Sequence, residues 1–152
     1  MLPTPTRYTL VAGSGEGRTA LNSFDQALLN SGIGNMNLLR VSSILPPAAV
    51  HVEEFRMRPG SLLPTAYGAI TSEVPGERIA AGVAVGRSPG DFGVIMEFSG
   101  KCSRAEAEAE LEAMVREAFS MRGLDLAEYR VKAVEHVVKS KGCAFAAAAL
   151  WY

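Results

Sequence analysis

The sequence predicts a single α+β domain in which packed sheets carry helices on their outer faces. One observation is the length of 152 residues with 48% hydrophobic content, which suits one buried core. Another is the pattern of periodic segments: two show helical periodicity, and about seven shorter ones have strand character. Prolines and glycines separate these segments, as expected for many short elements with tight connections.

The first half of the chain contains one amphipathic helix flanked by strands. Its apolar residues recur at helical spacing over residues 20–30, with an N-cap at Thr19 and a stop at Gly32. The expected neighbours are a strand over 8–12, a glycine-rich loop over 13–17, and a strand over 36–44 that two prolines end.

The second half contains the stronger helix signal, from Arg104 to Met121. Ser103 and Glu106 form an S-x-x-E capping box, and Gly123 follows as a stop. The expected strands cover residues 62–74, 79–85, 92–98, 129–138 and 143–151, with turns at 75–76, 88–91 and 140–142. The first and last of these turns are expected to close hairpins. The alanine run at 146–149 has helix propensity, but its hairpin pattern with 129–138 favours a strand.

Composition and charge exclude several classes of function. The formal net charge is −1 and no basic run is present, so nucleic-acid binding has little electrostatic support. There is no apolar segment long enough for a membrane span, and the N-terminal residues lack the apolar stretch of a signal peptide. The cysteines, Cys102 and Cys143, and the histidines, His51 and His136, show neither disulfide-framework nor metal-ligand spacing. We therefore expect a cytoplasmic protein without a metal.

Two polar motifs remain. The glycine series at 13–17 matches neither the dinucleotide nor the P-loop pattern, so a flexible turn is the expected interpretation. A serine pair, Ser42-Ser43, ends an apolar strand just before Pro46-Pro47. Taken alone, this pair indicates only polar residues at a strand end.

The serine pair stands within a longer pattern that covers almost the whole chain. The chain resembles the pyruvoyl-dependent arginine decarboxylases in eight segments, which occur in the order of that family. These segments are LVAGS (10–14), LNSFD (21–25), GIGN (32–35), RVSSILPP (40–47), PTAYG (64–68), IME (95–97), GKCS (100–103) and GCAFAAAALWY (142–152). The fold implied by the resemblance is an αββα sandwich of mainly antiparallel sheets.

The resemblance implies self-cleavage between Ser42 and Ser43. The Ser43 hydroxyl attacks the Ser42 carbonyl carbon and converts the amide into an ester. Elimination leaves dehydroalanine, and hydration with loss of ammonia leaves a covalent pyruvoyl group. The expected products are a β chain of residues 1–42 and an α chain of residues 43–152. No pyridoxal phosphate is required, because the pyruvoyl ketone serves as the electron sink.

Three further site residues follow from the resemblance. Glu97 is the expected proton donor, and its apolar strand predicts a raised pKa for its carboxyl. Asp25 is expected to hold the guanidinium of arginine through two parallel hydrogen bonds. Asn37 lies six residues before Ser43 and is expected to donate to the oxyanion during cleavage or to orient the substrate carboxylate.

The implied reaction converts L-arginine to agmatine and carbon dioxide at subunit interfaces of a homotrimer or a dimer of trimers. Asp25 and Glu97 are then expected to face a pyruvoyl group from a neighbouring subunit. Two alternatives stay open: a pyruvoyl-dependent decarboxylase of another amino acid such as histidine, and an unprocessed trimeric binding protein. The sequence does not distinguish polyamine biosynthesis from acid resistance as the purpose of agmatine.

Overall fold

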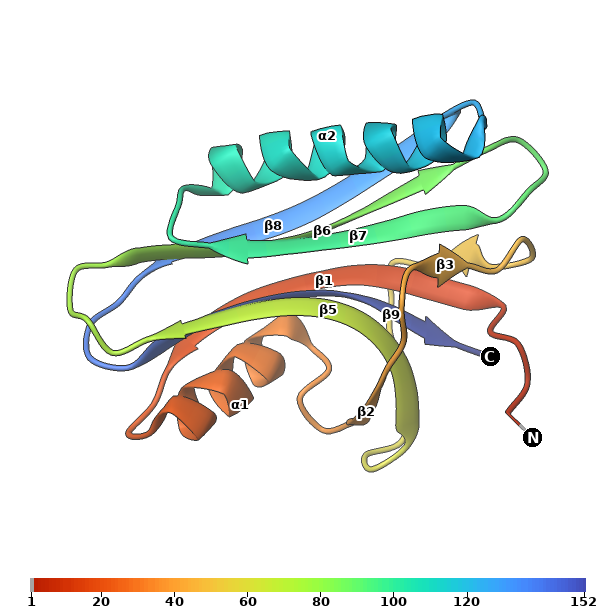
Figure 1. The fold of residues 1–152 in the computed structure, drawn as a ribbon. Coiled ribbons are helices and arrows are strands. Elements are labelled where there is room, and N and C mark those ends of the chain that lie inside the picture. The colour runs from red at the N-terminus through yellow and green to blue at the C-terminus, as the bar shows by residue number, and fades with distance from the viewer. Residues whose placement is uncertain (1) are drawn as a thin grey trace.

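Two sheets pack face to face in the computed structural model, which describes residues 2–152 (Figure 1). One is a mixed sheet of five strands in the order β2-β5-β9-β1-β4, and the other is an antiparallel sheet of four strands in the order β3-β7-β6-β8. Each sheet carries one helix on its outer face, so the layers follow the order helix, sheet, sheet, helix. The predicted α+β sandwich with helices outside is confirmed.

The five-stranded sheet is built around its C-terminal strand. Its members are β1 (Arg7–Glu16), β2 (Asn37–Arg40), β4 (Val50–His51), β5 (Leu62–Ser72) and β9 (Gly142–Trp151). β9 lies between β1 and β5 and pairs antiparallel with both, and all of its residues are buried. Its alanines face the second sheet and the outer helix in alternation. Small side chains are therefore required there, and the predicted strand over 143–151 is confirmed.

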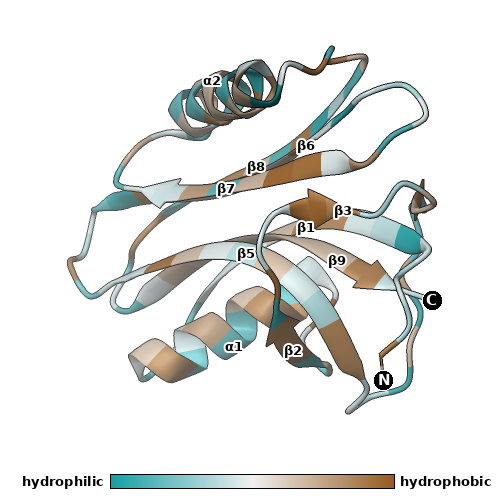
Figure 2. Ribbon diagram, turned by 45° about the vertical axis from the view of Figure 1, so that its right-hand side comes forward, coloured by the Kyte–Doolittle hydropathy of each residue, from teal (hydrophilic) through white to brown (hydrophobic). Residues whose placement is uncertain are grey.

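The four-stranded sheet is built around β6. Its members are β3 (Ile44–Leu45), β6 (Arg78–Arg87), β7 (Gly93–Gly100) and β8 (Glu128–Val137). β6 pairs antiparallel with β7 and β8, and alternate residues such as Val83 and Val85 enter the core between the sheets. Figure 2 shows hydrophobic colour along β7 and β3, where this sheet faces the other one.

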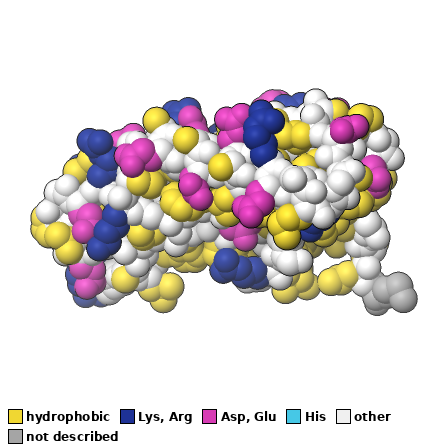
Figure 3. All heavy atoms as spheres, turned by 45° about the horizontal axis from the view of Figure 1, so that its top comes forward, with side chains coloured by type: hydrophobic (Ala, Val, Ile, Leu, Met, Phe, Trp, Pro, Cys, Tyr) yellow, Lys and Arg dark blue, Asp and Glu magenta, His cyan; other side chains and the backbone are white. Residues whose placement is uncertain are grey.

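The two helices begin and end at the predicted caps. α1 (Ala20–Ser31) starts after Thr19, whose side chain accepts a hydrogen bond from the Asn22 N–H, and it ends at Gly32 with φ of 97°. α2 (Arg104–Arg122) starts with the capping box of Ser103 and Glu106, and it ends at a left-handed glycine. Neither helix is long and apolar enough to cross a membrane, for the residues described. Acidic and basic side chains intermingle on the face seen in Figure 3, which includes α2.

Strand partners differ from the prediction in three places. The turn at Pro75-Gly76 does not close a hairpin, because β5 and β6 belong to different sheets, and the same holds for the turn at 140–142 between β8 and β9. The predicted strand over 36–44 is divided, since β2 ends at Arg40 and β3 begins at Ile44 in the other sheet. A turn sequence encodes a chain reversal but not the sheet that the next strand joins.

The glycine series at 13–17 also departs from the prediction, because β1 continues through Glu16 and only Gly17 lies outside it. A methyl group at Gly13 would lie 2.6 Å from the Ala27 carbonyl oxygen and 2.6 Å from the Ser31 nitrogen of α1. These glycines therefore allow the helix backbone to approach the strand closely.

We expect Gly13→Ala to destabilise the protein by about 1–3 kcal/mol, since the added methyl group meets helix backbone that cannot rotate away. Gly100→Ala is the control, because its methyl group would meet the movable end of the Phe98 ring at 3.3 Å. Denaturant unfolding measures both. Equal losses of stability in the two variants would contradict the close-packing explanation.

Candidate active site

The peptide bond between Ser42 and Ser43 lies where the chain leaves one sheet and enters the other. Before it, the Val41 N–H donates to the Thr65 carbonyl of β5 at 3.1 Å; after it, the Ser43 carbonyl accepts from the Ile95 N–H of β7 at 2.7 Å. Ser42 is exposed and Ser43 is half-buried. The bond therefore joins the sheets at the edge formed by β2 and β3 (Figure 1).

Glu97 lies in the layer between the sheets, close to this crossover. It pairs with Val83, which belongs to the core between the sheets, so its side chain points toward β5. Gly68 of β5 leaves space for it, because a methyl group there would lie 3.4 Å from the Glu97 Cβ. On β7, Glu97 follows Ile95 by two residues on the same face, about 7 Å along the strand from the residue that binds Ser43.

Burial raises the pKa of Glu97 above its ordinary value, as its apolar strand predicted. Desolvation is the larger cause, and the positive charge of Arg40 opposes it. Arg40 ends β2, where its guanidinium donates to the Tyr67 carbonyl at 3.0 Å and lies 4.3 Å from the centre of the Tyr67 ring. β5 thus fixes the position of Arg40, and the positive charge of Arg40 limits the rise in the pKa of Glu97.

A mainly apolar cavity of about 260 Å³, which we call the junction cavity, opens beside the serine pair. Both ends of the described chain and both sides of the junction contribute to its wall, including Leu2, Ser42, Ile44, Leu150 and Tyr152. The cavity places apolar surface beside Ser42, at the bond expected to be cleaved.

Asn37 begins β2, at the opposite end of this strand from the junction. Its side-chain amide donates to the Gly60 carbonyl at 2.8 Å, and its backbone N–H donates to the Ser61 carbonyl at 2.9 Å. Within residues 2–152 no hydrogen bond joins it to Ser43. Asn37 therefore tethers the loop before β5, and its catalytic role stays a prediction.

Asp25 lies on the exposed side of α1, which covers the outer face of the five-stranded sheet. The helix buries Ser23, Ala27 and Leu28 on its other side. Among the described residues, Asp25 takes part in no ion pair or side-chain hydrogen bond. One copy of the chain thus brings Ser43 and Glu97 to neighbouring positions and leaves Asp25 on another surface.

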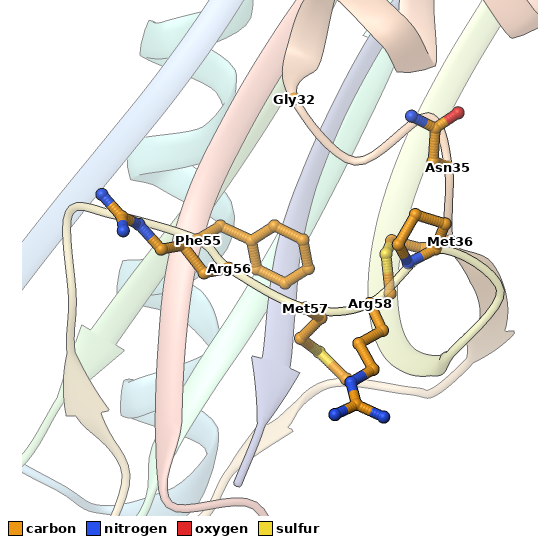
Figure 4. Close-up of a pocket in the computed structure, with 8 residues that line it drawn as sticks. Gly32, Asn35, Met36, Phe55, Arg56, Met57 and Arg58 are labelled. Atoms are coloured by element: carbon orange, nitrogen blue, oxygen red, sulfur yellow. The ribbon is translucent and has the colours of Figure 1, made fainter.

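A wider cavity of about 650 Å³ opens elsewhere, between the end of α1 and the loop that precedes β5 (Figure 4). In this view the Phe55 ring turns inward, while the guanidinium groups of Arg56 and Arg58 extend in different directions. None of the predicted catalytic residues lines this cavity. Its size alone therefore does not make it the reaction site.

Three residues near the junction had no predicted role: Arg40, Tyr67 and Ile95. All three stand in segments that carry the family resemblance, but the contact between Arg40 and Tyr67 depends on the parallel pairing of β2 with β5. Ile95 acts through its backbone N–H, which no side-chain pattern reveals. The sequence signal that could have pointed to Arg40 was a basic residue three positions before Ser43.

Comparisons with known proteins extend the resemblance. The family model for pyruvoyl-dependent arginine decarboxylase (PvlArgDC) matches residues 7–152. The pyruvoyl-dependent arginine decarboxylase of Methanocaldococcus jannaschii is 54% identical over 150 residues, which cover 97% of this chain and 91% of that protein. The corresponding protein of Methanococcus maripaludis is 49% identical, with 97% and 92% covered. That of Pyrococcus horikoshii is 43% identical, with 98% and 96% covered.

The two-sheet fold, the serine junction and these matches define a carboxy-lyase class that uses a covalent pyruvoyl group. The chain belongs to the pyruvoyl-dependent arginine decarboxylase family. Ser43 fits the origin of such a group, because its carbonyl already accepts the Ile95 N–H and its neighbours Ser42 and Ile44 line the junction cavity. That carbonyl is the one that would be conjugated with the pyruvoyl ketone.

We expect Arg40→Met to raise the pKa of Glu97 further, because burial then acts without the opposing positive charge. Carboxyl carbon NMR across a pH titration measures this change, with Glu97→Gln used to assign the signal. Arg58→Met removes an equal charge from a distant loop and is expected to leave the titration unchanged. A fall in the pKa of Glu97 in Arg40→Met would refute the assigned electrostatics.

Proposed function

We propose that this chain decarboxylates L-arginine to agmatine and carbon dioxide, with a pyruvoyl group derived from its own Ser43. One observation carries the proposal: the Ser42-Ser43 bond crosses between the sheets beside the half-buried Glu97, in a chain that matches the family over residues 7–152. The single domain is thus a proenzyme that is cleaved into residues 1–42 and 43–152.

Processing begins when the Ser43 Oγ attacks the carbonyl carbon of Ser42. The C–N bond breaks, an ester forms, and the Ser43 nitrogen takes the proton. Elimination then removes the Ser43 α-proton and breaks its Cβ–O bond, which releases the Ser42 carboxylate. Addition of water and loss of ammonia complete the ketone. The Ile95 N–H at the Ser43 carbonyl draws electron density from the α-carbon and so favours loss of its proton.

During turnover the pyruvoyl group supplies an electron sink next to the substrate amine. The Ile95 N–H polarises the amide carbonyl beside the ketone. Glu97 delivers a proton to the carbon that has lost carbon dioxide. Its raised pKa keeps Glu97 protonated at a higher pH than an exposed glutamate.

Substrate binding in this proposal uses a second copy of the chain. Asp25 presents an exposed carboxylate that suits two parallel hydrogen bonds from a guanidinium. Around the junction, Leu2, Ile44 and Tyr152 are exposed by 64%, 44% and 40%, and a neighbouring subunit would cover such apolar surface. A homotrimer, alone or as a dimer of trimers, is the assembly in which Asp25 of one subunit serves the Ser43 site of the next.

Cleavage is expected to leave the two fragments in one folded unit. Residues 1–42 contribute β1, α1 and β2 to the five-stranded sheet. β1 pairs with β9 along its whole length, from Arg7 opposite Trp151 to Glu16 opposite Gly142. β2 stays paired with β5 through four register positions. The β chain is therefore held by backbone hydrogen bonds and core packing after the covalent link is lost.

Intact-mass analysis after incubation under native conditions tests processing. The native chain is expected to give fragments 1–42 and 43–152, together with agmatine in an activity assay. The second fragment is expected to be lighter by one ammonia than an unmodified peptide of residues 43–152. Ser43→Ala is expected to abolish both, because alanine has no oxygen to attack Ser42. Ser42→Ala keeps the nucleophile and is the matched control. A native chain that remains uncleaved would favour the unprocessed binding protein.

The substrate assignment depends on Asp25. Asp25→Ala is expected to raise the KM for arginine at least about tenfold, since a charge-assisted hydrogen-bonding partner is lost, and to leave self-cleavage unchanged. Asp125→Ala, which removes another exposed carboxylate, is expected to leave the KM unaltered. Normal arginine affinity in Asp25→Ala would reject arginine-specific recognition by this residue, and histidine and other amino acids would then be assayed.

A further inference from the structure

The second open edge of the sandwich lies on the far side from the serine junction, where β4 and β8 are the last strands of their sheets. Arg130 and Lys132 of β8 pair with Val85 and Val83 of β6, whose side chains enter the core between the sheets. Paired positions share a face, so both cationic side chains of β8 also point toward the first sheet. An edge strand thus directs two positive charges inward.

His51 faces these charges from β4. It pairs with Tyr8 of β1, and the two rings meet edge to face with centroids 5.3 Å apart. The His51 side chain is only 18% exposed. Its pKa is lowered by burial first and then by Arg130 and Lys132, while Glu53 acts in the opposite direction. His51, which can bind a proton and donate to an anion, therefore lies in a positive environment beside Arg130 and Lys132.

These groups line one polar cavity of about 170 Å³, together with Leu10, Glu53 and Val131. Glu53 supplies the only carboxylate in this lining; it is 90% exposed and lies 4.0 Å from the His51 Nδ1. Within residues 2–152, neither Arg130 nor Lys132 forms a salt bridge. The cavity therefore gathers two exposed cationic side chains against one exposed carboxylate, and this excess of positive charge favours an anionic ligand.

We propose that this cavity binds a phosphate group, as inorganic phosphate or as part of a small phosphorylated compound. A guanidinium offers two parallel donors to a phosphate, an ammonium adds a point charge, and a protonated imidazole adds a third donor. The cavity volume corresponds to about six molecules of liquid water, so a tetrahedral oxyanion fits with hydration. The site is separate from the proposed decarboxylation and does not depend on it.

Inward charges on an edge strand also discourage pairing between molecules. That role accounts for Arg130 and Lys132 alone. It does not account for a shielded histidine directed at them across the gap between the sheets. A phosphate ligand accounts for all three groups, and the two explanations differ in whether the histidine responds to phosphate.

The chain has two histidines, which makes NMR of their ring carbons a direct test. The full-length protein is titrated with pH, with and without inorganic phosphate, at constant ionic strength set by chloride. Phosphate is expected to raise the pKa of His51 by about one unit, and the ring signal of His136, which contacts Glu16 near the other end of β8, is the reference. Glycerol phosphate and acetate, tested in the same way, distinguish a phosphomonoester from free phosphate and from a carboxylate.

Two variants sharpen the test. Lys132→Gln and Arg130→Gln are each expected to weaken phosphate binding at least about tenfold, as loss of a charged donor predicts. Lys139→Gln removes an equal charge just beyond β8 and is expected to retain native affinity. Preferential response to either phosphate compound supports the site. An unchanged His51, an equal response to acetate, or equal weakening in Lys139→Gln would overturn it.

Discussion

The passage of the chain from one sheet to the other at Ser42-Ser43 is the constraint on which the candidate site depends. β2 is fixed to β5 and β3 is fixed to β7, so the residues between them have little freedom. The hydrogen bond from Ile95 to Ser43 anchors the downstream side of the bond. A backbone held on both sides restricts the conformations of the peptide group, and such restriction is what an intramolecular attack requires.

Glu97 shows how the same layer of the sandwich combines packing with chemistry. A carboxyl between two sheets would normally be costly, but Gly68 provides space and Arg40 supplies a nearby opposite charge. The remaining desolvation destabilises the ionised form. Stability from this group is therefore greatest at low pH, and it declines as the pH rises through the raised pKa of the folded state.

Much of the fold could be predicted because its signals are local. The capping box at Ser103 lies within one turn of α2, and the alanine strand 143–151 carries a continuous buried pattern. The sheet joined by the strand after Pro75-Gly76 could not be predicted, because long-range packing decides which strands pair. Ser43 and Glu97 were found through family resemblance and then placed near each other by the register of β7. Asp25 lies on another face, so a single chain does not complete the predicted substrate site.

The position of β1 inside a sheet has a consequence for how the protein is made. Before cleavage, β1 meets β9 as part of one polymer, and folding is unimolecular. Under the proposed cleavage, the same pairing would become an association between two molecules, and its recovery after denaturation would depend on their concentration. The short fragment also carries core residues such as Tyr8 and Leu10, so the long fragment cannot rebuild the core alone. In the proposed processing, only the uncut chain would fold as a single molecule, and refolding of the cleaved protein would be disfavoured in dilute solution.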